Sequence, residues 1–182
     1  RLEEIIHRDI SLSYKILKYV NSVGFGLKGK ISSIKQAVAM MGNEKLSKFV
    51  TLVLLKGLGE DKPSELIVTS IIRGRFSELV AESLGFKDQI SDAFLTGMFS
   101  LMDALLDKPM DKVLAELPLN DNISGALQRQ PSKLTLILET VIAYEQGNWD
   151  KYDIYRQTIK LDDETAKRLY LEAVLWMGNI EQ

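Results

Sequence analysis

Five polar residues follow one line through the otherwise apolar stretch from Gln89 to Asp107. Their spacing of four, four, three and four residues stacks them on one face of a helix, and they are Asp92, Thr96, Ser100, Asp103 and Asp107. Carboxylate and hydroxyl oxygens on such a strip either face solvent or line a pocket. The side to which the strip points therefore decides whether this helix carries a site.

The residue types needed for common catalytic sites are scarce. Asp103 and Asp107 lie one helical turn apart, but we expect no second acid to face them and predict that they are exposed or cap a helix end. A metal-dependent phosphohydrolase built of helices needs several converging His and Asp ligands, and the chain has one histidine, His7, and no cysteine. A Ser-His-Asp hydrolase would also depend on His7, and no G-x-S-x-G motif presents a serine. We therefore predict no catalytic residue, no metal site and no cofactor.

A basic segment near the N-terminus is the second candidate site. Residues 1–57 have a charge balance of +6 and residues 58–182 one of −8. Within the basic part, Lys28, Lys30 and Lys35 lie in and after a glycine-containing loop, which lacks the preceding strand of a phosphate-binding loop. These lysines form either an ordinary solvated surface, which we favour, or an anion-binding or partner surface. With a net charge of −2, we do not expect nucleic acid as a partner.

The elements that position these residues are all predicted to be helices. The segment from Gln89 to Asp107 has an apolar face too wide for a surface helix and should be enclosed by others. A long helix from Ser64 to Leu84 carries Gly74 at its middle, where we expect close contact with another helix. Further helices are predicted at Leu12–Asn21, from a Ser33 cap to Gly42, and at Glu44–Lys56, Met110–Glu116, Asp121–Gln130 and Trp149–Ile159. Another begins at Pro131-Ser132, is separated from the next by Gly147 and Asn148, and has on its inner face Leu134, Ile137, Leu138, Val141, Ile142 and Glu145. Asp162 or Asp163 caps the last helix. No segment alternates with a period of two, so no substantial sheet is expected.

Aromatic residues near the C-terminus allow two interpretations. Trp149, Tyr152 and Tyr155 could form a stacking platform for bases, but aromatics at helical spacing more often pack against a neighbouring helix, and we favour that interpretation.

No apolar run approaches the roughly 18 residues needed to span a bilayer, and the first residues do not form a signal peptide. We therefore expect a cytoplasmic protein with no membrane partner. Because the chain begins at Arg1, without Met, it is expected to be a fragment of a longer protein.

Two groups of motifs resemble a known family. The helix Leu12–Val20 is followed by Asn21-Ser22, and a second segment runs from Ser33-Ile34 through Ala37 to Gly42. Together they resemble the HDOD family, bacterial signalling domains related to HD phosphohydrolases. The segments 96–110, 116–119 and 143–149 are similar to the subgroup in which HDOD follows an EAL cyclic di-GMP phosphodiesterase domain.

The resemblance relates the polar strip to the metal-binding residues of the catalytic relatives. The His-Asp pair of relatives that keep it would fall at about Ser100 and Leu101, and the upstream histidine of the catalytic relatives would fall near Arg73. Leucine cannot bind a metal, and serine is a poor ligand. The resemblance therefore implies a vestigial pocket at Ser100, Asp103 and Arg73, or a pocket that side chains have filled, which is the alternative we favour.

We therefore expect one all-α HDOD domain over residues 1–182, with a core at about 1–110 and a helical extension at about 110–182. It would belong to a longer EAL-HDOD protein and act as a non-catalytic signalling or interaction module. The resemblance implies an EAL domain in the same chain, another protein or a second copy as partner. The alternatives are a cryptic HD-type nucleotide phosphohydrolase, or a nucleotide or nucleic-acid sensor that uses the basic N-terminal part.

Overall fold

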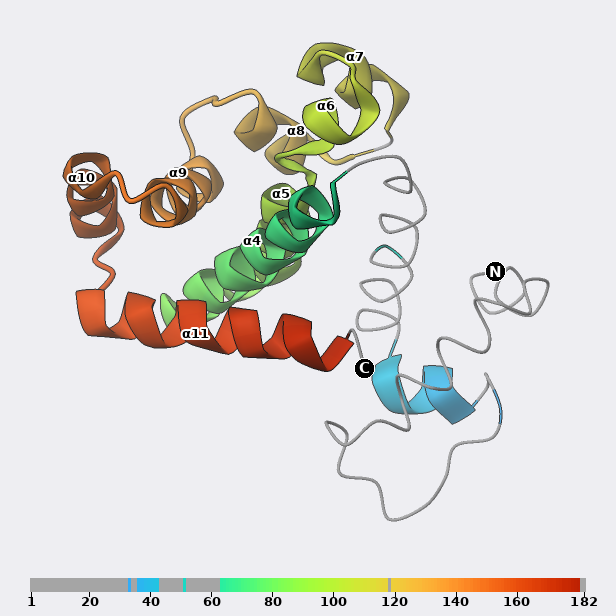
Figure 1. Ribbon diagram of the computed structural model, residues 1–182, viewed down its shortest axis with the longest axis horizontal. Coiled ribbons are helices and arrows are strands. Elements are labelled where there is room, and N and C mark those ends of the chain that lie inside the picture. The colour runs from blue at the N-terminus through green and yellow to red at the C-terminus, as the bar shows by residue number, and fades with distance from the viewer. Residues whose placement is uncertain (1–32, 34–35, 43–50, 52–62, 118, 181–182) are drawn as a thin grey trace. The chain divides into compact units, whose positions relative to one another are not determined.

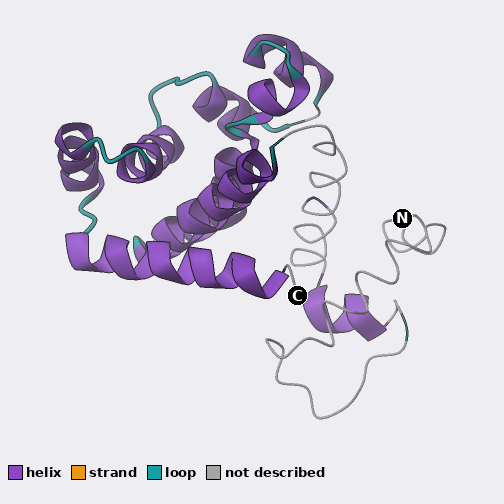
Figure 2. Ribbon diagram, viewed as in Figure 1, coloured by secondary structure: helices purple, strands orange, loops and turns teal. Residues whose placement is uncertain are grey.

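The computed structural model describes residues 33, 36–42, 51, 63–117 and 119–180. The chain divides into two compact units, Arg1–Leu58 and Gly59–Gln182. The described residues contain helices, turns and loops and no strand (Figure 2), which confirms the predicted all-α fold class.

In the first unit, the structure describes one short helix over residues 36–42. The Gln36 amide donates a hydrogen bond of 3.2 Å to Ser33 Oγ, so Ser33 caps the helix as predicted. Gly42 has a φ of 72° and ends the helix in the left-handed conformation that glycine favours. The predicted helix at Leu12–Asn21 lies outside the described residues, and of the predicted helix Glu44–Lys56 the structure describes Thr51, which is helical.

The second unit is a bundle of helices of unequal length (Figure 1). Its elements are α4 (Ser64–Ser83), η2 (Lys87–Gln89), α5 (Ile90–Phe99), α6 (Met102–Leu106), α7 (Met110–Glu116), α8 (Asp121–Leu127), α9 (Lys133–Glu145), α10 (Trp149–Ile159) and α11 (Asp163–Ile180). Helix α4 packs along α5 and is crossed by α11, while α9 and α10 pack against each other. Phe76, Val80 and Ala81 of α4 are fully buried and belong to the core that these helices share.

Two glycines allow α4 and α5 to come unusually close. A Cβ on Gly74 would lie 3.0 Å from the Phe94 carbonyl oxygen, and one on Gly97 would lie 2.6 Å from the Arg73 carbonyl oxygen. The distance at Gly97 is too short for a methyl group, and the distance at Gly74 would require the neighbouring helix to shift. The close contact predicted at Gly74 is confirmed, and Gly97 supplies its counterpart on α5.

The prediction of one continuous helix from Gln89 to Asp107 is wrong, because the chain breaks at Ser100 and Leu101 between α5 and α6. The Ser100 amide donates to the Gly97 carbonyl at 3.3 Å, and the Ser100 hydroxyl donates to the same oxygen at 2.7 Å. In a continuous helix, that carbonyl would accept from the Leu101 amide. Ser100 therefore occupies the acceptor that the next helical turn needs.

The last three helices begin at side-chain caps. At the start of α9, the Thr135 amide donates to Ser132 Oγ at 3.0 Å. At the start of α10, the Lys151 amide donates to Asn148 Oδ1 at 3.3 Å. At the start of α11, the Thr165 amide donates to Asp162 Oδ2 at 2.9 Å. Gly147, with a φ of 64°, makes the turn between α9 and α10. These caps agree with the predicted helix starts.

Candidate functional site

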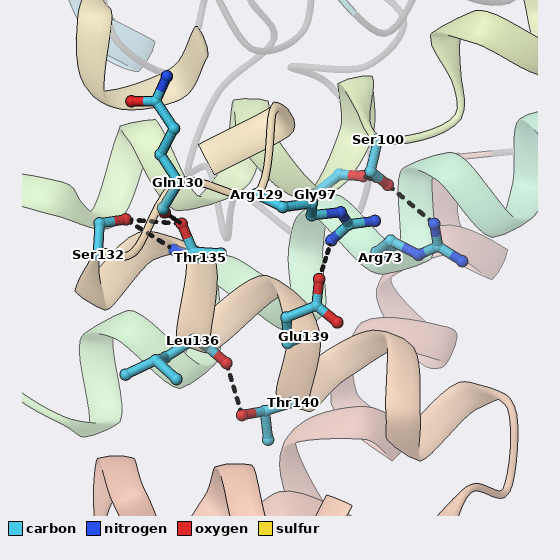
Figure 3. Close-up of polar contacts among 10 residues, drawn as sticks. All are labelled: Arg73, Gly97, Ser100, Arg129, Gln130, Ser132, Thr135, Leu136, Glu139 and Thr140. Atoms are coloured by element: carbon cyan, nitrogen blue, oxygen red, sulfur yellow. Dashed lines mark hydrogen bonds and ion pairs between the residues drawn. The ribbon is translucent and has the colours of Figure 1, made fainter. Parts of the chain in front are cut away.

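Arg73 and Ser100 are the two members of the predicted vestigial pocket that the structure brings together. Arg73 lies in the middle of α4, and Ser100 follows the last residue of α5. The Arg73 Nη1 donates to Ser100 Oγ at 2.8 Å (Figure 3). Because the Ser100 hydroxyl also donates to the Gly97 carbonyl, one hydroxyl connects the guanidinium to the end of α5.

Glu145 is the third member of this site. It is the last residue of α9, and its Oε2 accepts from Arg73 Nε at 2.8 Å. The side chains of Arg73 and Glu145 are 8% and 9% exposed, so the ion pair is buried. The only sequence signal for Glu145 was its place on the apolar inner face of the predicted helix. An acid at such a position is informative because buried charges are normally paired.

The electrostatics of the pair are dominated by desolvation. Burial raises the pKa of Glu145 above its usual value of 4.5, and the charge of Arg73 and its hydrogen bond oppose that shift. Glu145 Oε1 is buried and has no hydrogen-bond partner among the described residues. Glu145 also ends a helix, where the helix dipole disfavours a carboxylate. Burying Glu145 therefore has a desolvation cost that its contact with Arg73 offsets only in part.

The polar strip of α5 and α6 divides between the interior and the surface. Thr96 is buried, whereas Asp103 and Asp107 are exposed. The Asp103 carboxylate accepts from the neighbouring Ala104 amide at 2.8 Å. Asp107 adopts a left-handed conformation with a φ of 52° at the end of α6. Asp103 therefore lies on the surface, apart from the buried contact between Arg73 and Ser100.

Arg73 and Glu145 form a buried ion pair that Ser100 extends by one hydrogen bond. A guanidinium stays protonated in proteins and cannot ligate a metal. In the part of the chain that the structure describes, no three His, Cys, Asp or Glu side chains come together as a possible metal site. What the arrangement can do is hold three helices at one point: α4 through Arg73, α5 through Ser100 and α9 through Glu145.

The aromatic residues at the start of α10 differ in their exposure. Tyr152 is 2% exposed and packs edge-to-face on Tyr144 with a centroid distance of 5.2 Å, which confirms its predicted place in the core. Trp149 is 58% exposed, although its edge contacts Tyr144, and it borders a shallow surface hollow at residues 146–150. The ring contact of Trp149 with Tyr144 of α9 confirms the predicted packing against a neighbouring helix, although the Trp149 side chain is largely exposed.

Helix α11 has an apolar stripe on its outer face. Its inner face buries Ala166, Leu169, Ala173 and Met177. Leu171, Val174 and Leu175 are 58%, 36% and 61% exposed. With Gly178, whose Cβ position is open, they follow the i, i+3, i+4, i+7 pattern by which one helix contacts another. We name these four residues the α11 stripe.

The predicted basic surface cannot be placed. Lys28, Lys30 and Lys35 lie outside the described residues, as does His7. Among the described helices, none is both long enough and apolar enough to cross a membrane.

Comparison with known proteins supplies the family. The model of the HDOD domain matches residues 1–106. The chain belongs to the HDOD family. The matched part of this HDOD chain includes Arg73, Gly97 and Ser100, whereas Glu145 and the α11 stripe lie beyond it.

Two curated proteins are similar to this HDOD chain over its whole length. One is the cyclic di-GMP phosphodiesterase CdgJ of Vibrio cholerae, which is 34% identical over 182 residues that make up 100% of the chain and 42% of CdgJ. The other is the uncharacterized protein YuxH of Bacillus subtilis, which is 37% identical over 183 residues, covering 99% of the chain and 44% of YuxH. The chain therefore spans less than half the length of either relative. No solved structure matches it.

Proposed function

We propose that this HDOD chain is a non-catalytic signal-transduction module that regulates a cyclic di-GMP phosphodiesterase domain of the EAL type in the same polypeptide. The observation that carries the proposal is the buried Arg73–Glu145 ion pair with Ser100. It lies where the family resemblance would put the histidines of an HD-type metal centre, and a guanidinium there is incompatible with metal-ligand chemistry. The similarity to CdgJ supports the link to cyclic di-GMP.

The regulatory role rests on the surface of the chain. The α11 stripe exposes apolar side chains at the spacing used in helix-to-helix contacts. Both relatives contain more than half their length beyond the matched part. We therefore propose the EAL domain of the longer polypeptide as the occupant of the α11 stripe. We place this regulator in the cytoplasm, together with the cyclic di-GMP that the EAL domain would hydrolyse.

The rate of cyclic di-GMP hydrolysis by the longer polypeptide tests this proposal. Leu171→Glu combined with Leu175→Glu places two charges in the α11 stripe, and we expect the rate to change by about threefold or more, which corresponds to roughly 0.7 kcal/mol of coupling. Ile154→Glu is the matched control, because Ile154 is an isolated apolar residue on α10, 63% exposed, and should leave the rate unchanged.

Three outcomes would contradict the proposal. The first is an encoded polypeptide without an EAL domain. The second is an unchanged rate in the double variant with the fold intact by circular dichroism. The third is the same change in rate for Ile154→Glu. If the stripe instead binds a second copy, the wild-type mass in sedimentation would be that of a dimer, and the double variant would be a monomer with an unchanged rate.

A further inference from the structure

Arg73 connects two places in the fold that are distant in sequence. Through Nη1 it reaches Ser100, at the break between α5 and α6, and through Nε it reaches Glu145, at the turn between α9 and α10. The guanidinium is planar and fixes the directions of its donors. A movement of one partner therefore displaces the donor that serves the other.

Each of the two contacts lies at a place where a helix ends. At Ser100, the hydroxyl that accepts from Arg73 also donates to the Gly97 carbonyl and so ends α5. At Glu145, the chain leaves α9 through Gln146 and Gly147, whose amides donate to Ile142 and Tyr144. The Asn148 side chain then begins α10. The positions of α6 and α10 follow from these two breaks.

The contact to Glu145 is the weaker part of this arrangement. Glu145 accepts from Arg73 through one oxygen only, and its other oxygen is buried without a partner among the described residues. Arg73 is the charged group that acts on Glu145 from the helices packed around it. Neutralising Glu145 would remove the charge that holds the guanidinium at the end of α9. The Arg73 Nη1 that donates to Ser100 would then no longer be held in one position.

We infer that Arg73 couples the α5–α6 break to the α9–α10 turn, so that loss of either contact loosens both places. We call this device the Arg73 link. It is a property of the fold and does not depend on the proposed regulatory function. If α6 or α10 changes position during signalling, the Arg73 link is where one movement would reach the other.

Amide hydrogen exchange tests the Arg73 link in the full chain. Glu145→Gln keeps the size of the side chain and removes its charge. We expect exchange over residues 97–103 to rise by about fivefold, the factor that corresponds to weakening one charge-assisted hydrogen bond. Exchange over residues 163–177 in α11 should stay as in the wild type, which separates local loosening from global unfolding.

The reciprocal variant and a control complete the experiment. Ser100→Ala removes the hydroxyl and should raise exchange over residues 143–150, because coupling between two sites is mutual. Glu139→Gln is the matched control, since Glu139 lies on the same helix and pairs with Arg129 at the surface (Figure 3). It should leave residues 97–103 unchanged.

The inference fails if the two variants act only locally. It is overturned if Glu145→Gln raises exchange at residues 143–150 and leaves residues 97–103 at the wild-type rate. It is equally overturned if Ser100→Ala changes residues 97–103 alone. Should Glu145→Gln not fold, the Ser100→Ala result decides, because that variant removes a single half-buried hydroxyl.

Discussion

Buried charge is the feature of single residues that shapes this molecule most. Arg73 and Glu145 are both almost fully enclosed, and each is acceptable inside the protein only because of the other. The site that the resemblance predicted as vestigial is filled with a guanidinium, a hydroxyl and a carboxylate. Replacing one partner should therefore cost more than replacing most surface residues.

Arg73→Met should reduce the free energy of unfolding by about 3–5 kcal/mol near neutral pH, because it leaves the Glu145 carboxylate buried without its partner. The folded-state pKa of Glu145 already lies above the usual value of 4.5, and it would rise further without Arg73. Between the unfolded and folded pKa values the folded state holds a proton that the unfolded state lacks, so stability falls as pH rises through that window.

Urea unfolding at about pH 5 and about pH 7.5 measures this effect. We expect Arg73→Met to lose less stability at the lower pH, because burial raises the pKa of Glu145 and a larger fraction of its carboxyl is protonated there in the folded state. Adding Glu145→Gln to Arg73→Met should flatten the difference. An equal loss at both pH values would show that the missing packing of Arg73, and not the charge of Glu145, causes the destabilisation.

Among the helices, the contact between α4 and α5 has the tightest geometry. It depends on Gly74 and Gly97, whose missing side chains let the two backbones approach. Adding even one methyl group at Gly97 would push against the Arg73 carbonyl and the Ser77 hydroxyl, both at 2.6 Å. The backbone of α4 would have to move, and with it the Arg73 side chain.

Gly97→Ala should therefore reduce the free energy of unfolding by about 2 kcal/mol, since overpacking outweighs the better helix propensity of alanine. Gly178→Ala is the matched control on α11, where nothing lies within 4 Å of the new methyl group. It should be neutral or stabilise the chain by up to about 1 kcal/mol. Thermal or urea unfolding compares the two. A Gly97→Ala variant as stable as Gly178→Ala would contradict the close packing of α4 and α5.

The helices that follow local rules could be predicted from the sequence. Pro109 and Leu117 bound α7 as expected, and the caps at Ser132, Asn148 and Asp162 mark their helices correctly. These signals act within four residues of the chain. The class of the fold followed from them, since every predicted element was a helix.

The break at Ser100 was missed because one of the hydrogen bonds that fix it is not local. Ser100 is a weak helix breaker on its own, and the hydrogen bond that fixes its hydroxyl comes from Arg73, 27 residues earlier. The role of Glu145 depends likewise on a residue 72 positions away. Apolar periodicity placed Glu145 on the inner face but could not identify its partner. Arg73 and Ser100 could thus be predicted as members of the candidate site, whereas Glu145 and the hydrogen bonds that join the three residues could not.

At the scale of the whole molecule, the HDOD region runs over residues 1–106. It includes the whole of the first compact unit and the second unit as far as residue 106, and α7 to α11 lie beyond it. Arg73 and Ser100 belong to the family region, whereas Glu145 belongs to the C-terminal helices. The buried ion pair therefore joins the family part of the second unit to the helices that follow it.

The central claim is that this chain has no hydrolytic activity of its own. The most direct measurement is hydrolysis of a panel of cyclic and linear phosphodiesters by the isolated 182-residue chain, with Mn²⁺ or Mg²⁺ supplied. We predict turnover no greater than that of the metal solution alone, and no change in Ser100→Ala or Asp103→Asn. Metal-dependent turnover that either substitution abolishes would contradict the account and would identify an HD-type phosphohydrolase.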